Sequence, residues 1–338
     1  MSDYGFIDNH RELKRLLSNL DVDSKNCEHS VRYKRGEITN DLLKSFTGHT
    51  IDLDELSATE TDSFQYGDDV IFLLEAFNEG DCYVCDAKSD RITARVNKKG
   101  EKTQTFSINP YDTCVCETGD VYFTNYENNS IARLSTTRSY MNLLSYSGSF
   151  TTVICTDPLT PLGICQSLDG GLLVTLIDME SEDFKLEATS RRLLRHIALN
   201  GDIIKEYKYL EDKQTRLFIQ PVRVVQNKNS QICVVNRTSG KTGELVVISP
   251  SGRPMFIYCG QDLIHGFNPN DVVCDSLCNI IVADAGNHLI HLLSPDGDFL
   301  KYLLTDNEVK TPTSLSLSKR TLWVGNEHGL VKVFKYMA

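Results

Sequence analysis

Residues 267–300, FNPNDVVCDSLCNIIVADAGNHLIHLLSPDGDFL, contain one complete folding unit. Short apolar runs that suit buried strands alternate in it with Pro, Asn, Asp and Gly, which are typical of tight turns. The strands predicted from this pattern are residues 271–274, 280–283, 289–293 and 299–304. Four short strands joined by turns form an antiparallel meander, and an isolated meander of this size cannot bury both of its faces. The unit therefore needs neighbours of the same kind.

The second strand of this unit has counterparts along the chain. Each copy begins with a turn residue, continues with an apolar run and ends in Asp or Asn, whose side chain accepts hydrogen bonds from the following turn. The six copies are residues 80–86, 119–125, 171–178, 230–236, 279–284 and 321–326. A proline precedes the first strand of five units, at positions 110, 161, 221, 269 and 312. Four-stranded repeats of this length are propeller blades.

The sequence thus predicts an all-β, six-bladed propeller with blades at residues 64–107, 108–155, 159–210, 218–259, 267–305 and 311–338. The last blade has only three strands before the chain ends, and a bare edge would invite association between molecules. We expect a strand from residues 31–53 to fill that place. The predicted divisions are an N-terminal extension at 1–30, a linker with the closing strand at 31–63, and the propeller at 64–338.

Composition narrows the possible function classes. The formal net charge of −11 disfavours a general phosphate-binding surface. No apolar run approaches the length needed to cross a bilayer, and the N-terminus has no signal-peptide pattern. The 11 cysteines, an odd number spread over the repeats, are typical of reduced core thiols, so a cytoplasmic location is expected. Cys82 and Cys85 have zinc-like spacing but would point to opposite faces of a strand, so no metal site is predicted.

One constellation follows from the register of the first strands, although no catalytic motif is present. The side chains two residues after each proline are expected to form a ring at one mouth of the central channel. Asp69 takes the same place in the first blade by counting from Gly67. Such a ring could bind a cation, a basic side chain or a small polar ligand, or it could only hold neighbouring blades together. Its members are Asp69, Asp112, Gly163, Arg223, Asp271 and Ser314.

A second candidate surface is the loop face, which comprises the turns after each second strand. These turns contain more Asp and Glu than Lys and Arg and few aromatic residues, whereas an RNA-binding face needs the opposite. The loop face therefore suits a protein or peptide partner, and no cofactor is predicted. The contact residues predicted on it are Tyr126, Asn236, Arg237, Asn287, His288 and Asn326.

Residues 268–288, NPNDVVCDSLCNIIVADAGNH, resemble an NHL repeat, in which a strand ends in Asp before an Asn-containing turn. With residues 162–174 and 322–326, they resemble the C-terminal propeller of tripartite-motif (TRIM) proteins over about residues 64–338. The resemblance implies a substrate-recruiting module. Leu13, Leu16, Leu17 and Leu20 lie on one face of a predicted helix, which is either a short surface helix or, as the resemblance implies, the end of a coiled coil. The chain would oligomerise through it only if that helix continued. The chain lacks RING and B-box spacings, so ubiquitin-ligase activity would belong to a longer isoform or a partner.

Three hypotheses remain. The leading one is a non-enzymatic propeller of the NHL type that recruits a protein partner, such as a substrate for ubiquitination. The second is an RNA-binding propeller, which the acidic charge disfavours. The third is a calcium-dependent hydrolase of the six-bladed lactonase type, with Asp69, Asp112 and Asp271 around the ion.

Overall fold

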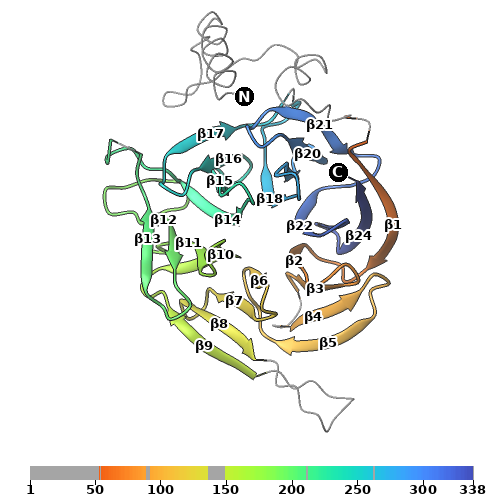
Figure 1. Ribbon diagram of the computed structural model, residues 1–338, viewed down its shortest axis with the longest axis horizontal. Coiled ribbons are helices and arrows are strands. Elements are labelled where there is room, and N and C mark those ends of the chain that lie inside the picture. The colour runs from red at the N-terminus through yellow and green to blue at the C-terminus, as the bar shows by residue number, and fades with distance from the viewer. Residues whose placement is uncertain are drawn as a thin grey trace, which may run out of the picture. The chain divides into compact units, whose positions relative to one another are not determined.

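The computed structural model describes residues 53, 55–88, 92–135, 149–210, 212–261 and 263–337. These residues form 24 strands in six antiparallel, four-stranded sheets (Figure 1). The predicted all-β, six-bladed propeller is therefore confirmed. The predicted extension at 1–30, with its leucine-bearing helix, lies outside the described residues.

Each of blades 1 to 5 is a meander of four consecutive strands that runs outward from the centre (Figure 1). Blades 1 to 3 contain β2 (Ile71–Ala76), β3 (Asp81–Asp86), β4 (Ile92–Asn97) and β5 (Lys102–Ser107); β6 (Thr113–Val115), β7 (Val121–Asn125), β8 (Ser130–Ser135) and β9 (Ser149–Cys155); and β10 (Thr160–Gln166), β11 (Leu172–Ile177), β12 (Arg192–Ile197) and β13 (Ile203–Tyr207). Blades 4 and 5 contain β14 (Gln220–Gln226), β15 (Ile232–Arg237), β16 (Gly243–Ile248) and β17 (Pro254–Tyr258); and β18 (Pro269–Cys274), β19 (Ile280–Asp284), β20 (Leu289–Leu293) and β21 (Phe299–Leu304).

Blade 6 joins the two ends of the propeller. Its strands are β22 (Pro312–Ser318), β23 (Thr321–Asn326), β24 (Leu330–Met337) and, as the outermost strand, β1 (Ser57–Gln65). β1 pairs with β24 from Ser57 opposite Met337 to Gln65 opposite Leu330. The closing strand therefore comes from residues 57–65 and not from residues 31–53, where the sequence placed it. Its sequence, SATETDSFQ, is mostly exposed or half-buried, so it lacks the apolar alternation that marks the other strands.

The apolar core lies between neighbouring sheets and not within a single blade. Each first strand contacts the first strands of the two adjacent blades, which closes the ring from β2 through β6, β10, β14 and β18 to β22. The seam between blades 6 and 1 illustrates the packing. Trp323 and Val331 of blade 6 cluster with Ile71 and Val84 of blade 1, and all four residues are fully buried. Burying apolar area against both neighbours supplies the stability that a lone meander lacks.

The ten cysteines of the described residues are not in disulfide bonds, and half of them are buried. None of the described segments is a helix with the length and hydropathy that a membrane crossing requires.

Candidate functional site

A β-bulge lies near the start of the first strand in most of the blades. In five blades the pairing between the first and second strands shifts register there. Bulges bend a strand and reorient a side chain, and they are frequent beside functional sites. The residues that follow the shift are Leu73, Ile164, Arg223, Asp271 and Ser314.

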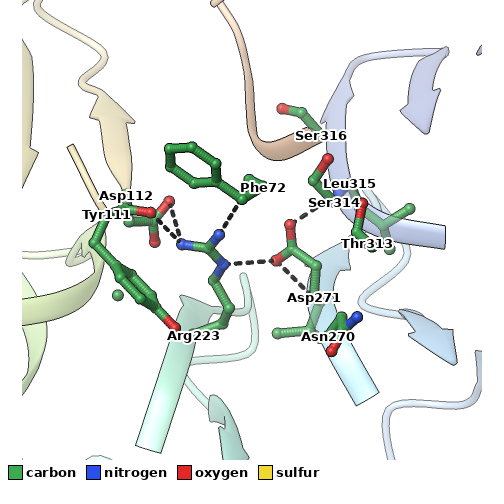
Figure 2. Close-up of polar contacts among 12 residues, drawn as sticks. Phe72, Tyr111, Asp112, Arg223, Asn270, Asp271, Thr313, Ser314, Leu315 and Ser316 are labelled. Carbon is green, nitrogen blue, oxygen red and sulfur yellow. Dashed lines mark hydrogen bonds and ion pairs between the residues drawn. The ribbon is translucent and has the colours of Figure 1, made fainter. Parts of the chain in front are cut away.

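Arg223 lies at the centre of the arrangement and reaches from blade 4 to three other blades (Figure 2). Its Nη1 donates to the carbonyl oxygen of Tyr111 at 2.8 Å and lies 3.2 Å from Oδ1 of Asp112. Its Nη2 donates to the carbonyl oxygen of Phe72. Its Nε lies 3.9 Å from Oδ1 of Asp271. A planar guanidinium with five donors suits this role, which a lysine with one ammonium group would not fill.

Asp112 and Asp271 occupy equivalent positions and make equivalent contacts. In each, Oδ1 accepts the N–H of the next residue in its own strand, from Thr113 at 2.9 Å and from Val272 at 2.8 Å. In each, Oδ2 accepts an N–H from the following blade, from Ile164 at 3.0 Å and from Leu315 at 2.8 Å. Both carboxylates therefore link neighbouring blades.

The other two ring positions also serve contacts between blades. The Ser314 hydroxyl donates to the carbonyl oxygen of Ile71 at 2.9 Å, which joins blade 6 to blade 1. Gly163 allows blades 3 and 4 to approach closely, since a Cβ there would lie 2.7 Å from both Cα of Arg223 and the carbonyl oxygen of Val222. This is the close approach for which glycine is required.

Asp69 does not occupy the position in blade 1 that is equivalent to the other ring residues, so this prediction is wrong. Leu73 pairs with Cys85, one residue before the end of β3, as Asp271 pairs with Ala283 one residue before the end of β19. Leu73 is therefore the equivalent of Asp271. Asp69 precedes β2, where its Oδ1 accepts the N–H of Val70 at 2.7 Å. Blade 1 has Ile71 where the other blades have proline, and counting from Gly67 misplaced the position by four residues.

Glu75 is the acidic residue that sequence reasoning missed. It lies two residues after Leu73 on β2 and is half-buried. Its Oε1 accepts the N–H of Val115 from blade 2 at 2.9 Å, and its Oε2 accepts the hydroxyl of Ser316 from blade 6 at 3.4 Å. An acidic residue in the otherwise apolar strand Ile71–Ala76 is uncommon, and that contrast could have drawn attention to it. We name Glu75, Asp112, Arg223 and Asp271 the channel cluster.

The channel cluster contains three carboxyl groups and one guanidinium, and this imbalance of charge sets the protonation of the carboxyl groups. Burial and, to a smaller extent, the nearby charges of Asp112 and Asp271 raise the pKa of Glu75 to about 8, against the lowering effect of the Val115 N–H. Burial likewise raises the pKa of Asp271 to about 7, because the attraction of Arg223 offsets only part of the cost. Burial also raises the pKa of Asp112. The cluster therefore holds at least one carboxyl proton near neutral pH.

This protonation predicts a pH dependence of stability. Glu75 has an ordinary pKa of 4.5 and a folded pKa of about 8, so the folded chain binds more protons between these values. The free energy of unfolding should therefore fall as the pH rises through this window. Glu75→Gln removes the titration. The difference in the free energy of unfolding, Glu75→Gln minus wild type, should therefore be about 2–4 kcal/mol larger at pH 8 than at pH 5 in urea denaturation. Parallel pH profiles for the two proteins would contradict the assignment.

The channel cluster does not fit the calcium site of the third hypothesis. Asp69 contacts Val70 and Lys88. The guanidinium of Arg223 stands between the carboxylates of Asp112 and Asp271, where a cation would have to bind (Figure 2). Their remaining oxygens accept backbone N–H groups. Within the described part of the chain, no group of three or more His, Cys, Asp or Glu side chains is arranged to hold a metal ion.

The predicted loop-face residues are mostly engaged in holding turns. Asn236 is 1 % exposed, and its Oδ1 accepts the N–H groups of Ile219 and Gln220, both at 2.9 Å. Asn326 Oδ1 accepts the N–H groups of His328 and Leu330, both at 2.9 Å. These contacts leave the two amides little capacity for a partner.

The remaining loop-face residues differ in exposure. Arg237 donates to the side chain of Asn270, and Asn287 donates to Oδ2 of Asp284 at 2.8 Å. Nδ1 of His288 accepts the N–H of Thr311 at 2.9 Å. Tyr126, which is 39 % exposed, is the most open of the set.

A Ser, a His and an Asp meet on blade 3, but not as a catalytic triad. Ser167 Oγ and Asp169 Oδ1 both contact Nε2 of His196, at 3.1 and 3.0 Å. A triad needs the nucleophile and the acid on opposite ring nitrogens. This cluster therefore stabilises the turn between β10 and β11.

No protein-family model and no curated protein matches the chain, whereas several solved structures share its fold. A protein assigned by inference as a gluconolactonase superposes with a TM-score of 0.58 at 15% identity, over 85% of this chain and 98% of its own. The virginiamycin B lyase of Staphylococcus aureus gives 0.54 at 14% identity, over 81% and 98%. The PQQ-bound aldose sugar dehydrogenase of Streptomyces coelicolor gives 0.60 at 12% identity, over 83% and 98%. At these identities the likeness shows the fold alone.

Two expectations change with these comparisons. The prediction that the propeller is not an enzyme is overturned, since all three of these similar structures are named as enzymes. The resemblance to TRIM proteins is supported only at the level of the six-bladed propeller, because these neighbours are of the lactonase and lyase kind. The NHL, TRIM and ubiquitination assignments gain no support.

Proposed function

We propose that the chain is a propeller enzyme that uses Glu75 for proton transfer to a small polar substrate in the central channel, with hydrolysis of a lactone or ester as its reaction class. The observation that carries this proposal is the channel cluster, in which Glu75 lies near enough to Asp112 and Asp271 for their charges to raise its pKa, while Arg223 contacts both aspartates. Perturbed titratable groups gathered at the centre of a fold are typical of functional sites.

The protonation of Glu75 suits this chemistry. Opening a lactone requires a base for the attacking water and an acid for the leaving oxygen, and efficient groups have pKa values near the working pH. With a pKa of about 8, Glu75 is mainly protonated at pH 7 and can donate to the leaving oxygen. Val115 and Ser316 fix its two oxygens, so the proton is offered from a defined place.

The other members of the channel cluster act through Glu75. Asp112 and Asp271 raise its pKa by their negative charge, while Arg223 holds both carboxylates and keeps them from repelling one another. All three side chains are occupied by contacts between blades, so they are positioning residues in this proposal. The similarity to a gluconolactonase supports a lactone as the first substrate to try. No metal is invoked.

A substrate-recruiting role of the tripartite-motif kind has weaker support. It depends on the loop face, where Asn236 and Asn326 are buried and already accept backbone N–H groups. Its remaining contact points are few, and Tyr126 is the most exposed of them.

The test is a hydrolysis assay at pH 7 with a panel of sugar-derived δ-lactones, simple γ- and δ-lactones and a 4-nitrophenyl ester. Wild type should hydrolyse at least one lactone above the spontaneous rate. Glu75→Gln, which keeps the size of the side chain but cannot exchange the proton, should lower kcat by about 100-fold or more. The decrease should lie in kcat and not in KM, since proton transfer occurs in the transition state.

The control is Glu180→Gln, which changes the same residue type at an exposed position in the insertion after β11. It should retain the wild-type rate. Equal rates for wild type and Glu75→Gln, or no hydrolysis of any panel member by wild type, would overturn the proposal.

A further inference from the structure

We propose that Cys114 and Cys116 form a redox-active dithiol that closes to a disulfide when the protein meets a hydroperoxide. The two Sγ atoms lie 3.9 Å apart, and both residues belong to the same strand and turn at blade 2. They are separated by one residue, so their side chains lie on the same face of the strand. A disulfide bond is about 2.05 Å long, so the sulfurs need to approach by about 2 Å.

The local backbone permits this approach. Cys114 lies in β6, which ends at Val115, and Cys116 begins the turn in which the Gly119 N–H donates to its carbonyl oxygen at 2.8 Å. Residues 117–119 of this turn are exposed, so the pair lies just beneath the surface although its members are 4 % and 5 % exposed. A hydroperoxide is small enough to reach sulfurs at that depth.

Each thiol has a defined part in the reaction. The hydrogen bond between the two sulfurs lowers the pKa of Cys116, which favours Cys116 as the attacking thiolate. With hydrogen peroxide as the oxidant, the Cys116 sulfur attacks one peroxide oxygen and becomes a sulfenic acid, and the O–O bond breaks to release one water. The Cys114 sulfur then attacks the sulfenyl sulfur, and a second water leaves as the S–S bond forms. Two thiols are oxidised by two electrons, and the peroxide is reduced to two waters.

The dithiol is connected to the channel cluster through Val115. The N–H of Val115, between the two cysteines, donates to Oε1 of Glu75 at 2.9 Å. Drawing the sulfurs together moves this peptide group, so the hydrogen bond to Glu75 should lengthen. The disulfide itself is independent of the proposed function, whereas its effect on turnover rests on that function.

The described chain offers a comparison pair with similar spacing. Cys82 and Cys85 lie on β3, where the thiol of Cys82 donates to the carbonyl oxygen of Tyr83 at 3.3 Å and that of Cys85 to Ile92 at 3.4 Å. The two thiols therefore donate to different carbonyl oxygens and not to one another. They should therefore stay reduced under conditions that close the Cys114–Cys116 pair.

The experiment treats the full chain with a small molar excess of hydrogen peroxide and follows intact mass, then maps peptides without reduction. We expect a loss of about 2 Da, a linked peptide that joins Cys114 to Cys116, and full reversal by dithiothreitol. Cys114→Ser should trap a dimedone-reactive sulfenic acid on Cys116 and lose no mass. Cys155→Ser, at an exposed cysteine, should behave as wild type.

Oxygen addition without the loss of about 2 Da, or a disulfide between other cysteines, would overturn the inference. Peptide mapping of wild type decides the question even where a serine variant fails to fold. Because the readout is mass, the dithiol can be confirmed while the enzymatic proposal fails, and the reverse also holds. If both stand, peroxide should change the hydrolysis rate of wild type and leave that of Cys114→Ser unchanged.

Discussion

Replacing Arg223 by methionine should destabilise the propeller by about 3–5 kcal/mol at pH 7.5 in urea denaturation, the largest effect expected of any single substitution in the channel. Arg223 is 7 % exposed and supplies the positive charge beside Asp112 and Asp271. Without it, two buried carboxyl groups must either stay ionised without a partner or take up protons. The carbonyl oxygens of Tyr111 and Phe72 also lose their donor.

Two further measurements separate this charge effect from simple loss of packing. Adding Asp271→Asn to Arg223→Met should recover a part of the lost stability, because it removes one of the unpaired charges. Lowering the pH to 5 should recover some as well, since the carboxyl groups then bind protons. Arg320→Met, at an exposed position, should change stability by less than about 0.5 kcal/mol. A loss below 1 kcal/mol for Arg223→Met would argue against the central role given to this residue.

Removing β1 should abolish ring closure and produce the second large effect. A chain that begins after Gln65 would leave the edge of β24 unpaired from Leu330 to Met337. Buried residues on that strand, among them Phe334 and Tyr336 at 1 % exposed, would lose the cover of β1. We expect a melting temperature lower by more than about 10 °C and oligomers in size-exclusion chromatography, because bare strand edges associate.

The matched control is a chain that begins at Leu53 and keeps β1. It should stay monodisperse and melt at least 10 °C above the shorter chain. Equal melting temperatures and elution volumes for the two truncations would show that β1 is not needed to close the propeller.

The number and order of the blades could be predicted from the sequence because each second strand is buried on both faces. Segments such as Ile280–Asp284 are therefore continuously apolar and end in a turn residue. β1 escaped this reading because it is an outer strand with polar side chains on both faces. What fixes β1 in place is the backbone pairing with β24, and backbone hydrogen bonds leave no pattern in the side chains.

The candidate site was predicted only in part, for a reason that lies in the bulges. Counting from the prolines selected Asp112, Arg223 and Asp271, which the structure brings into contact, and in blades 4 and 5 a bulge lies directly after the proline. Blade 1 has no such proline. Counting from Gly67 therefore gave Asp69, which precedes β2, and missed Glu75, which lies on β2. The contacts that each carboxylate makes with residues of other blades depend on the distance between those blades. The sequence of a single strand does not determine that distance.

The loop face shows how one residue type can serve two roles that the sequence does not distinguish. Asp284 at the end of β19 accepts N–H groups from Asn268, Gly286 and Asn287, so it builds the turn. The same chemistry would serve a peptide partner if the turn did not use it. Burial decides between the two roles, and burial follows from the packing of the whole ring.

The pKa of Glu75 in the folded chain is the most direct test of the central claim that the channel holds a proton at neutral pH. Carbon-13 NMR of the side-chain carboxyl groups, with Glu75→Gln to assign the resonance, measures it in the resting protein. The structure predicts a titration with a pKa of about 8, well above the ordinary value of 4.5 for glutamate. A Glu75 resonance that titrates between pH 4 and pH 5 would contradict the account.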